Sequence, residues 1–473
     1  MTKIFPRHHS LLLTLLLLGL LSSCKNDAPA ASQATTPSAT STPTVKKDPR
    51  ALPDWAKNAT IYEVNVRQYT PEGTFEAFSN HLPRLQKMGV DILWFMPIYP
   101  ISKTKRKGSL GSYYAVSDYR GINPEYGTMK DFDKMVGRIH DLGMHLILDW
   151  VPNHTGWDHR WISTHRNWYT QNDLGEIIDP IDPGTGKSWG WTDVADLNFD
   201  NPQMRKAMID QKLFWINQHG VDGFREDVAH GVPDLFWDEV AEAVFSTGKD
   251  VFMLAEAEVP SHRNSGNFHM GYGWSAHHLL NEIAHGKKSA QDLDAWLAED
   301  RKKFQKGMAM HFTSNHDENT WAGTVFDRMG AAHKTLAALT FVFDGMPLIY
   351  GGQEEPLKKR LEFFEKDDIG FKSYAYSDFY LRLATLKEEN QAIWNGSHGG
   401  ALKKMMDHPD IFAFEREKNG DKVIGIFNLS AERQVLLMPK EIKGTDLMTD
   451  SDITWKKGLE VPLNPWQYYI MTP

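Results

Sequence analysis

The sequence predicts an α/β fold: a (β/α)₈ barrel with a short inserted subdomain after its third strand and a C-terminal antiparallel β-sandwich. Three observations support this prediction. From Ala59 onward, short apolar runs rich in β-branched and aromatic residues alternate with stretches of helical period, the pattern of repeated β/α units around a parallel sheet. Eight such runs occur, the number that closes a barrel. After Ile393 the pattern changes to alternating strands joined by tight turns.

The N-terminal segment predicts export. "MTKIFPRHHSLLLTLLLLGLLSSC" has a basic start and an apolar run from Leu11 to Leu21 that is too short to span a bilayer comfortably. Its end resembles a bacterial lipoprotein box, in which the cysteine, here Cys24, is lipidated. We therefore expect a signal peptide over residues 1–24 and a flexible Pro-, Ser- and Thr-rich tether over 25–52. The expected location is the bacterial envelope, periplasmic or cell-surface, with a lipid anchor in a membrane and the outer membrane favoured.

Composition excludes several partners and sites. The 473 residues carry a formal net charge of −9 without a long basic block, so nucleic acid is not expected as a partner. Cys24 is the only cysteine, which excludes disulfides and thiolate metal sites. Aromatic residues make up 12% of the chain, with 16 Trp, a content that suits both core packing and the flat faces of sugars.

The barrel is predicted over residues 53–393. Its eight strand-forming runs, in chain order, are "TIYEVNV", "DILWFMP", "HLILDWVP", "VDGFRED", "VFMLAEAE", "MGYGW", "AMHFTSNHD" and "MPLIYGG". Amphipathic helices are expected between them, such as "DFDKMVGRIHDLG" and "NPQMRKAMIDQKLFWINQHG", each closed by a glycine. All eight loops that follow the strands of such a barrel converge on one face, where the active site lies.

Two segments depart from this rhythm. Residues 155–200 are rich in Trp, Gly and Asp with little periodicity, and predict the inserted subdomain beside the pocket. From Trp394 to Pro473 the strands alternate, and Asn419-Gly420 predicts a tight hairpin turn. This last region is the predicted β-sandwich.

Charged residues end the fourth run, "VDGFRED". Because strand side chains alternate between faces, Arg225 and Asp227 point the same way and Glu226 points the other way. An arginine on the same face favours the ionised form of Asp227 and is expected to lower its pKa. A carboxylate that acts as a nucleophile requires this ionised form.

Further acids end other runs. Glu256 follows an apolar strand, whose surroundings would favour the protonated form that a general acid needs. Asp149 and Asp317 end two more strands, with His154 and His316 close by in the sequence. Each residue alone is more often a cap or a satisfied polar group. Gathered at one barrel mouth, these residues predict a carboxylate-driven reaction.

The strand ends also match known motifs. "DWVPNH", "GFRED", "MLAEAE" and "SNHD" look like four conserved regions of the α-amylase superfamily, glycoside hydrolase family 13, and the chain resembles this family from about Trp55 to Pro473. The resemblance implies a TIM barrel and a retaining mechanism through a covalent glycosyl-enzyme. It makes Asp227 the nucleophile, Glu256 the general acid/base and Asp317 the transition-state stabiliser. It also implies the substrate-binding residues Tyr114, Asp149, His154, Arg225, His230 and His316.

The family resemblance leaves specificity open. It favours hydrolysis of α-1,4-glucosidic bonds in starch or maltooligosaccharides, with cyclomaltodextrinase, α-1,6-glucosidase or glucanotransferase activity as alternatives. Many members have Lys-His where this chain has His230-Gly231, which puts the sugar contacts on the leaving-group side in question. A non-catalytic sugar-binding lipoprotein is a further alternative, although all three catalytic acids are present.

The resemblance also bears on cofactors. Asn153 and Asp196 match residues that hold a structural calcium ion in some family members, and oxygen-only ligands suit calcium. The other ligands are not visible in the sequence, so calcium binding stays open. No organic cofactor is expected.

Overall fold

The computed structural model describes residues 48–473. The predicted signal peptide at 1–24, the lipidation at Cys24 and most of the predicted tether at 25–52 lie outside the described residues. No helix within residues 48–473 is both long and apolar enough to cross a membrane.

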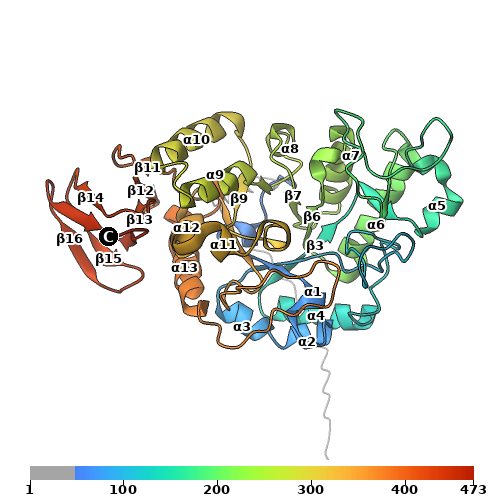
Figure 1. Ribbon diagram of the computed structural model, residues 1–473, viewed down its shortest axis with the longest axis horizontal. Helices are drawn as coiled ribbons and strands as arrows, with labels where there is room; N and C mark the ends of the chain where they lie inside the picture. Colours follow the sequence, from blue (N-terminus) through green and yellow to red (C-terminus); the bar gives the residue numbers. More distant parts are fainter. Residues whose placement is uncertain (1–47) are drawn as a thin grey trace, which may run out of the picture. The chain divides into compact units, whose positions relative to one another are not determined.

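Eight parallel strands close into a barrel, and each contains residues of one of the eight predicted runs (Figure 1). The strand order is β1-β10-β9-β8-β7-β6-β3-β2, and β1 pairs with both β2 and β10. The fold class predicted from the sequence is therefore confirmed. The barrel strands are β1 (Ile61–Val64), β2 (Ile92–Phe95), β3 (His145–Trp150), β6 (Gly223–Glu226), β7 (Phe252–Ala255), β8 (Met270–Tyr272), β9 (Met308–His311) and β10 (Met346–Tyr350).

Helices and short helical turns occupy the connections between the barrel strands. The α-helices are α1 (Val66–Tyr69), α2 (Phe75–Ser79), α3 (Leu82–Lys87), α4 (Met129–Asp141), α5 (Arg160–Thr164), α6 (Pro202–His219), α7 (Asp234–Phe245), α8 (Pro260–Asn264), α9 (Trp274–Ala284), α10 (Ala290–Lys303), α11 (Val325–Met329), α12 (His333–Val342) and α13 (Ser377–Glu389). The other helical turns are η1 (Asp54–Ala56), η2 (Arg166–Trp168), η3 (Ala229–Gly231), η4 (Glu318–Ala322), η5 (Gly330–Ala332), η6 (Gln391–Ile393) and η7 (Gly396–His398).

Local sequence signals set the ends of the two predicted helices. Thr128 and Asp131 form a reciprocal capping box at the start of α4. Asn201 accepts hydrogen bonds from two backbone N–H groups at the start of α6, and Pro202 occupies its first position. Gly220 ends α6 in the left-handed conformation, with φ of 66°.

The inward side chains of the strands form an apolar cluster that includes Ile61, Trp94, Ile147 and Leu254. Gly223 lets β6 and β7 approach closely, because a Cβ atom there would lie 2.1 Å from the backbone oxygen of Phe252. Charged residues replace apolar ones at the C-terminal ends of the strands. The apolar cluster therefore supports the groups at the mouth of the barrel from below.

The inserted region follows β3. β4 (His154–Gly156) and β5 (Val194–Asp196) form an antiparallel pair, with α5 and η2 between them in the chain. In register, His154 lies opposite Asp196. This pairing ties both ends of the insert to the strand end that carries Asp149.

The C-terminal region forms two antiparallel sheets. One has the order β11-β12-β13-β18-β15-β16, and the other pairs β14 with β17. A shared apolar cluster that includes Ile411, Leu436 and Leu463 joins the two sheets. Asn419 and Gly420, at φ of 50° and 99°, form the predicted hairpin turn. The strands are β11 (Lys403–Lys404), β12 (Ile411–Lys418), β13 (Asp421–Asn428), β14 (Gln434–Leu437), β15 (Ile442–Asp446), β16 (Asp452–Trp455), β17 (Glu460–Leu463) and β18 (Tyr468–Thr472).

Candidate active site

A cleft of about 680 Å³ opens at the C-terminal ends of the barrel strands. The structure brings the three predicted catalytic acids Asp227, Glu256 and Asp317 to its wall. The other lining residues are Lys107, Ser112, Tyr114, His154, Trp191, Asp193, Val194, Val228, His230, Trp274, His316, Trp321, Phe363 and Phe364.

Arg225 joins three carboxylates from three neighbouring strand ends. Its Nη1 atom lies 2.8 Å from Asp227 Oδ1 and 2.9 Å from Asp149 Oδ1, while Nη2 lies 2.8 Å from Glu256 Oε1. Arg225 itself is fully buried, and Tyr272 accepts a hydrogen bond from its Nε atom. The planar guanidinium has several donors in fixed directions. It therefore fixes the two carboxylates that face the cleft relative to each other.

The direction of the pKa shift of Asp227 differs from the prediction. Burial raises its pKa well above the ordinary value, Arg225 lowers it, and the negative charges of Glu256 and Asp149 raise it again. The prediction that Arg225 gives Asp227 a low pKa is therefore wrong in its net direction. It overlooked burial, and it overlooked that one guanidinium is shared by three carboxylates.

Polar groups hold the carboxyl group of Glu256. Oε2 accepts a hydrogen bond of 2.8 Å from the backbone N–H of Val228, and Oε1 pairs with Arg225. These contacts differ from the apolar surroundings predicted from its strand, because the adjacent strand supplies the guanidinium. Val228 lies in the left-handed region with φ of 47°, a strained conformation for a β-branched residue. This strained turn aims its N–H at Glu256.

Asp149 lies deeper, behind the cleft. It accepts hydrogen bonds from Tyr114 at 3.0 Å and from the indole of Trp94 at 3.3 Å. Burial raises the pKa of Asp149 to about 7, against the opposing effects of Arg225 and His316. Tyr114 also bonds His316 Nε2 at 2.9 Å. Asp149 thus orients the tyrosine that lines the cleft.

Asp317 follows β9 at the start of a π-helical turn, η4. Oδ2 lies 3.3 Å from His316 Nε2, and Oδ1 accepts a hydrogen bond of 3.2 Å from the indole of Trp321. The turn is held by a second loop, because Arg360 donates to the backbone oxygens of Thr320 and Trp321. π-Helical turns often lie at functional sites, and this one places an exposed indole against Asp317.

Two histidines line the insert side of the cleft. Burial lowers the pKa of His154 to about 4, so its imidazole is neutral at physiological pH. His230 is exposed, and its ring lies 6.0 Å from that of Trp189. Trp189 in turn packs against Trp191 with ring centroids 4.8 Å apart. His230 therefore lies against a pair of tryptophans that the insert supplies.

Glu226 takes no part in the cleft. Its carboxylate is fully buried and pairs with the buried ammonium group of Lys212 on α6. The alternation of side chains along β6 therefore separates Glu226 from Arg225 and Asp227, as the sequence predicted.

The two predicted calcium ligands have different neighbours. Asn153 Nδ2 lies 3.3 Å from His154 Nδ1, whereas the carboxylate of Asp196 interacts with Thr170 and Asp179. Within residues 48–473, no group of three or more His, Cys, Asp or Glu side chains could hold a metal ion. Calcium takes six to eight converging oxygens. Calcium binding by Asn153 and Asp196 therefore stays a prediction, and no step of the mechanism depends on the ion.

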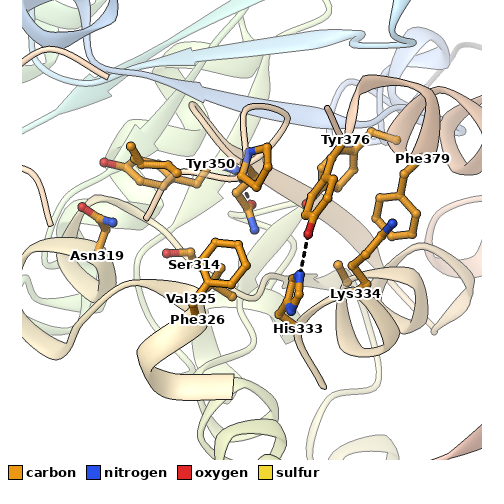
Figure 2. A pocket seen from close by; sticks show the side chains of 14 residues that line it. Ser314, Asn319, Val325, Phe326, His333, Lys334, Tyr350, Tyr376 and Phe379 are labelled. Carbon is orange, nitrogen blue, oxygen red and sulfur yellow. Dashed lines mark hydrogen bonds between the residues drawn. The ribbon is translucent and has the colours of Figure 1, made fainter. Parts of the chain in front are cut away.

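A second pocket lies beside the segment that carries His316 and Asp317, with Ser314 and Asn319 on its wall (Figure 2). Aromatic and aliphatic side chains of α11, α12 and the loop after β10 fill it, and His333 Nε2 bonds the hydroxyl group of Tyr376 at 3.0 Å. Its free volume is about 20 Å³, the space of one water molecule. This pocket is a packing gap rather than a second binding site.

Sequence reasoning missed several residues of the site. Glu63 on β1 is fully buried and bonds His316 Nδ1 at 2.5 Å. Its signal was a charged residue at an inward position of an otherwise apolar strand. Trp321 also escaped prediction, because its hydrogen bond to Asp317 depends on the π-helical turn.

Comparisons with known proteins agree with the geometry. A family profile described as "Alpha amylase, catalytic domain" matches residues 55–391. The chain is 25% identical to an alpha-amylase of Haloarcula japonica, covering 85% of this chain and 60% of that protein. It is also 25% identical to alpha-amylase 3 of Dictyoglomus thermophilum, covering 88% of this chain and 93% of that protein. The crystal structure of an alpha-amylase from Lactobacillus plantarum superposes with a TM-score of 0.78 at 27% identity, over 89% of this chain and 99% of that chain.

Proposed function

Because the chain belongs to the alpha-amylase family of glycoside hydrolases, we propose that it acts on α-glucans and hydrolyses α-1,4-glucosidic bonds of starch or maltooligosaccharides with retention of configuration. One observation carries this proposal: Arg225 holds Asp227 and Glu256 on its two terminal nitrogens, each at 2.8 Å. A single guanidinium can hold both carboxylates only if they lie close together. This proximity agrees with a retaining enzyme, in which the two carboxyl groups lie about 5–5.5 Å apart.

In the first step, Glu256 donates a proton to the glycosidic oxygen, and the bond between that oxygen and the anomeric carbon breaks. A carboxylate oxygen of Asp227 bonds to the anomeric carbon and forms a covalent glycosyl-enzyme. In the second step, Glu256 takes a proton from water, and the resulting oxygen nucleophile displaces Asp227. Two inversions at the anomeric carbon leave its configuration unchanged.

The surrounding residues stabilise the charge that develops in the transition state of each step. The anomeric carbon and ring oxygen become positively charged, and the carboxylates of Asp227 and Asp317 flank the cleft where this charge forms. His154, neutral at physiological pH, can donate to or accept from a sugar hydroxyl group. Tyr114 offers an aromatic face, held by its bonds to Asp149 and His316.

A panel of substrates tests this proposal. Residues 26–473 would be incubated with amylose, pullulan, isomaltose and cyclomaltodextrin, and the products separated by chromatography. We expect maltooligosaccharides from amylose and at least 10³-fold less product from Asp227→Asn. Preferred cleavage of isomaltose or cyclomaltodextrin would replace the α-1,4 assignment with one of the alternatives. Sugar binding without turnover would favour a binding protein.

We propose that the enzyme is exported and attached to the bacterial envelope through a lipid on Cys24. The support is the apolar run that ends in Leu21-Ser22-Ser23-Cys24 and the Pro-, Ser- and Thr-rich segment that follows it. Metabolic labelling with a fatty acid checks this. The full chain should carry the label and fractionate with membranes, and Cys24→Ala should lose both properties.

A further inference from the structure

Glu63 is a buried acid near the C-terminal end of β1. Its side chain is fully buried, and the residue lies in register with Trp94 of β2 and Tyr350 of β10. A buried carboxylate costs free energy unless it is paired. A buried carboxylate on a barrel strand therefore needs a cationic or hydrogen-bonding partner.

That partner is His316. Glu63 Oε1 lies 2.5 Å from His316 Nδ1, and the backbone N–H of His316 donates to the same oxygen at 3.4 Å. On the other side of the ring, Nε2 lies 2.9 Å from the hydroxyl group of Tyr114 and 3.3 Å from Asp317 Oδ2. Both ring nitrogens therefore face a carboxylate.

The contacts fix the protonation of the ring. An ionised carboxylate only accepts hydrogen bonds, whereas a neutral imidazole has one N–H and one acceptor nitrogen. A ring that donates to Glu63 at Nδ1, and at Nε2 to the Tyr114 hydroxyl group whose own hydrogen goes to Asp149, must carry both protons and a positive charge. The geometry alone thus favours an imidazolium ion.

We propose that Glu63 is a positioning residue that keeps His316 doubly protonated, so that its Nε2–H group donates to the hydroxyl group of Tyr114 and its positive charge lies beside Asp317. The inference rests on the proposed function, because that function gives Asp317 its role. Glu63 acts through His316 and does not line the cleft. It sets the direction and charge of the group that the substrate meets.

The charges around the pair agree with this assignment. Burial lowers the pKa of His316, but the carboxylates of Asp317 and Glu63 outweigh it and raise the pKa to about 9. The titratable and charged groups that face the pair are Tyr114 before α4, Asp149 on β3, Arg225 on β6, Tyr272 on β8, Tyr350 on β10 and Asp317 after β9.

The direct test is the titration of His316 in the protein without substrate. The enzyme would be labelled with ¹³C at the histidine Cε1 position, and His316→Gln would assign the signal. We expect a wild-type midpoint near 9. In Glu63→Gln the midpoint should fall by about one pH unit or more, because an amide keeps the shape but not the charge.

A second buried acid provides the matched control. Glu354 is also fully buried, and it accepts hydrogen bonds from Tyr62 at 2.7 Å and Arg84 at 2.9 Å. Glu354→Gln makes the same chemical change in the same barrel. It should leave the midpoint of His316 unchanged, whatever it does to stability.

Kinetics supply the second readout. In Glu63→Gln we expect kcat/KM at pH 7 to fall about tenfold to hundredfold, the effect of losing a hydrogen bond to a charged group. The ratio of kcat/KM at pH 8 to that at pH 6 should also fall, because His316 then loses its proton nearer neutrality. In a His316→Gln background, Glu63→Gln should have little further effect.

Several results would overturn the proposal. These are a wild-type midpoint near the ordinary histidine value of about 6.5, an equal shift in Glu354→Gln, or a full effect of Glu63→Gln in the His316→Gln background. If Glu63→Gln does not fold, the titration midpoint of His316 in the wild-type protein still tests the proposal. Because it needs no substrate, it also separates this proposal from the proposed function: lack of turnover on every α-glucan would overturn only the latter.

Discussion

Replacing Arg225 by glutamine should disable the enzyme through both carboxylates that face the cleft. The guanidinium is fully buried and lies 2.8 Å from Asp227 Oδ1 and 2.8 Å from Glu256 Oε1. A hydrogen bond to a charged group contributes about 1.5–3 kcal/mol, or about 10- to 150-fold in rate. Because the substitution removes the hydrogen bond to Asp227 and the ion pair with Glu256, and their effects add imperfectly, we expect kcat/KM to fall about 10²- to 10⁴-fold.

The same change should alter the pH dependence. Attack requires ionised Asp227, which is present above its pKa and lost as the pH falls through it. Burial raises this pKa and Arg225 lowers it, so removal of Arg225 raises it further. The acid limb of kcat/KM should lie above the ordinary aspartate value of about 3.9 in the wild type, and at still higher pH in Arg225→Gln.

Initial rates on maltooligosaccharides from pH 4 to pH 9 measure both effects. Arg225→Lys is the matched variant, because it keeps the charge but not the fork of donors. It should show the smaller shift of the acid limb and still lose rate. An acid limb that stays in place in Arg225→Gln, or moves to lower pH, would show that the shared guanidinium does not set the pKa of Asp227.

Three further predictions concern neighbouring features. Glu226→Gln strands the buried ammonium group of Lys212 and should cost about 3–5 kcal/mol in the free energy of unfolding. Lys212→Met with Glu226→Met should cost less, and equal losses in urea titrations would argue against a buried ion pair. Trp321→Phe removes the indole N–H that donates to Asp317. We expect kcat/KM to fall about 2- to 10-fold while Tm stays unchanged, and an unchanged kcat/KM would show that this hydrogen bond does not contribute to activity. Removal of divalent cations with EDTA should shift Tm by less than about 2 °C, because no cluster of three or more carboxylate or histidine ligands occurs within residues 48–473. A bound calcium ion would add RT ln(1 + [L]/Kd) to stability, so a larger drop reversed by calcium would show that the predicted ion binds.

The fold could be predicted because its signals are local. Each barrel strand is a mainly apolar run a few residues long. The acids that line the cleft stand at the C-terminal ends of several of these runs. The alternation along β6 also predicted the separation of Glu226 from Arg225 and Asp227. These properties depend on neighbours in the sequence, so pattern alone was sufficient.

The electrostatics could not be predicted, because they depend on segments far apart in the chain. The pKa of Asp227 is set by burial and by Glu256 and Asp149 on neighbouring strands. Glu63 lies 253 positions from His316, which it contacts. From the sequence, Glu63 was one charged residue in the first strand, and only closure of the barrel places it against the ring.

The hydrogen bond between Trp321 and Asp317 could not be predicted from the sequence for a different reason. The two residues are four positions apart, but the π-helical turn between them is held by Arg360 from another loop. The geometry of a turn is not set by its own sequence when a distant side chain caps its backbone oxygens. The surroundings of Asp196 are non-local too, because Thr170 and Asp179 of the insert interact with its carboxylate.

The anomeric configuration of the first product decides whether the enzyme retains or inverts. Maltooligosaccharide hydrolysis would be followed by ¹H NMR within minutes of mixing, before mutarotation, with Asp227→Asn alongside. We expect that the α-anomer of the new reducing end appears first and that the variant forms none. First formation of the β-anomer, or undiminished turnover by Asp227→Asn, would contradict a retaining mechanism with Asp227 as the nucleophile.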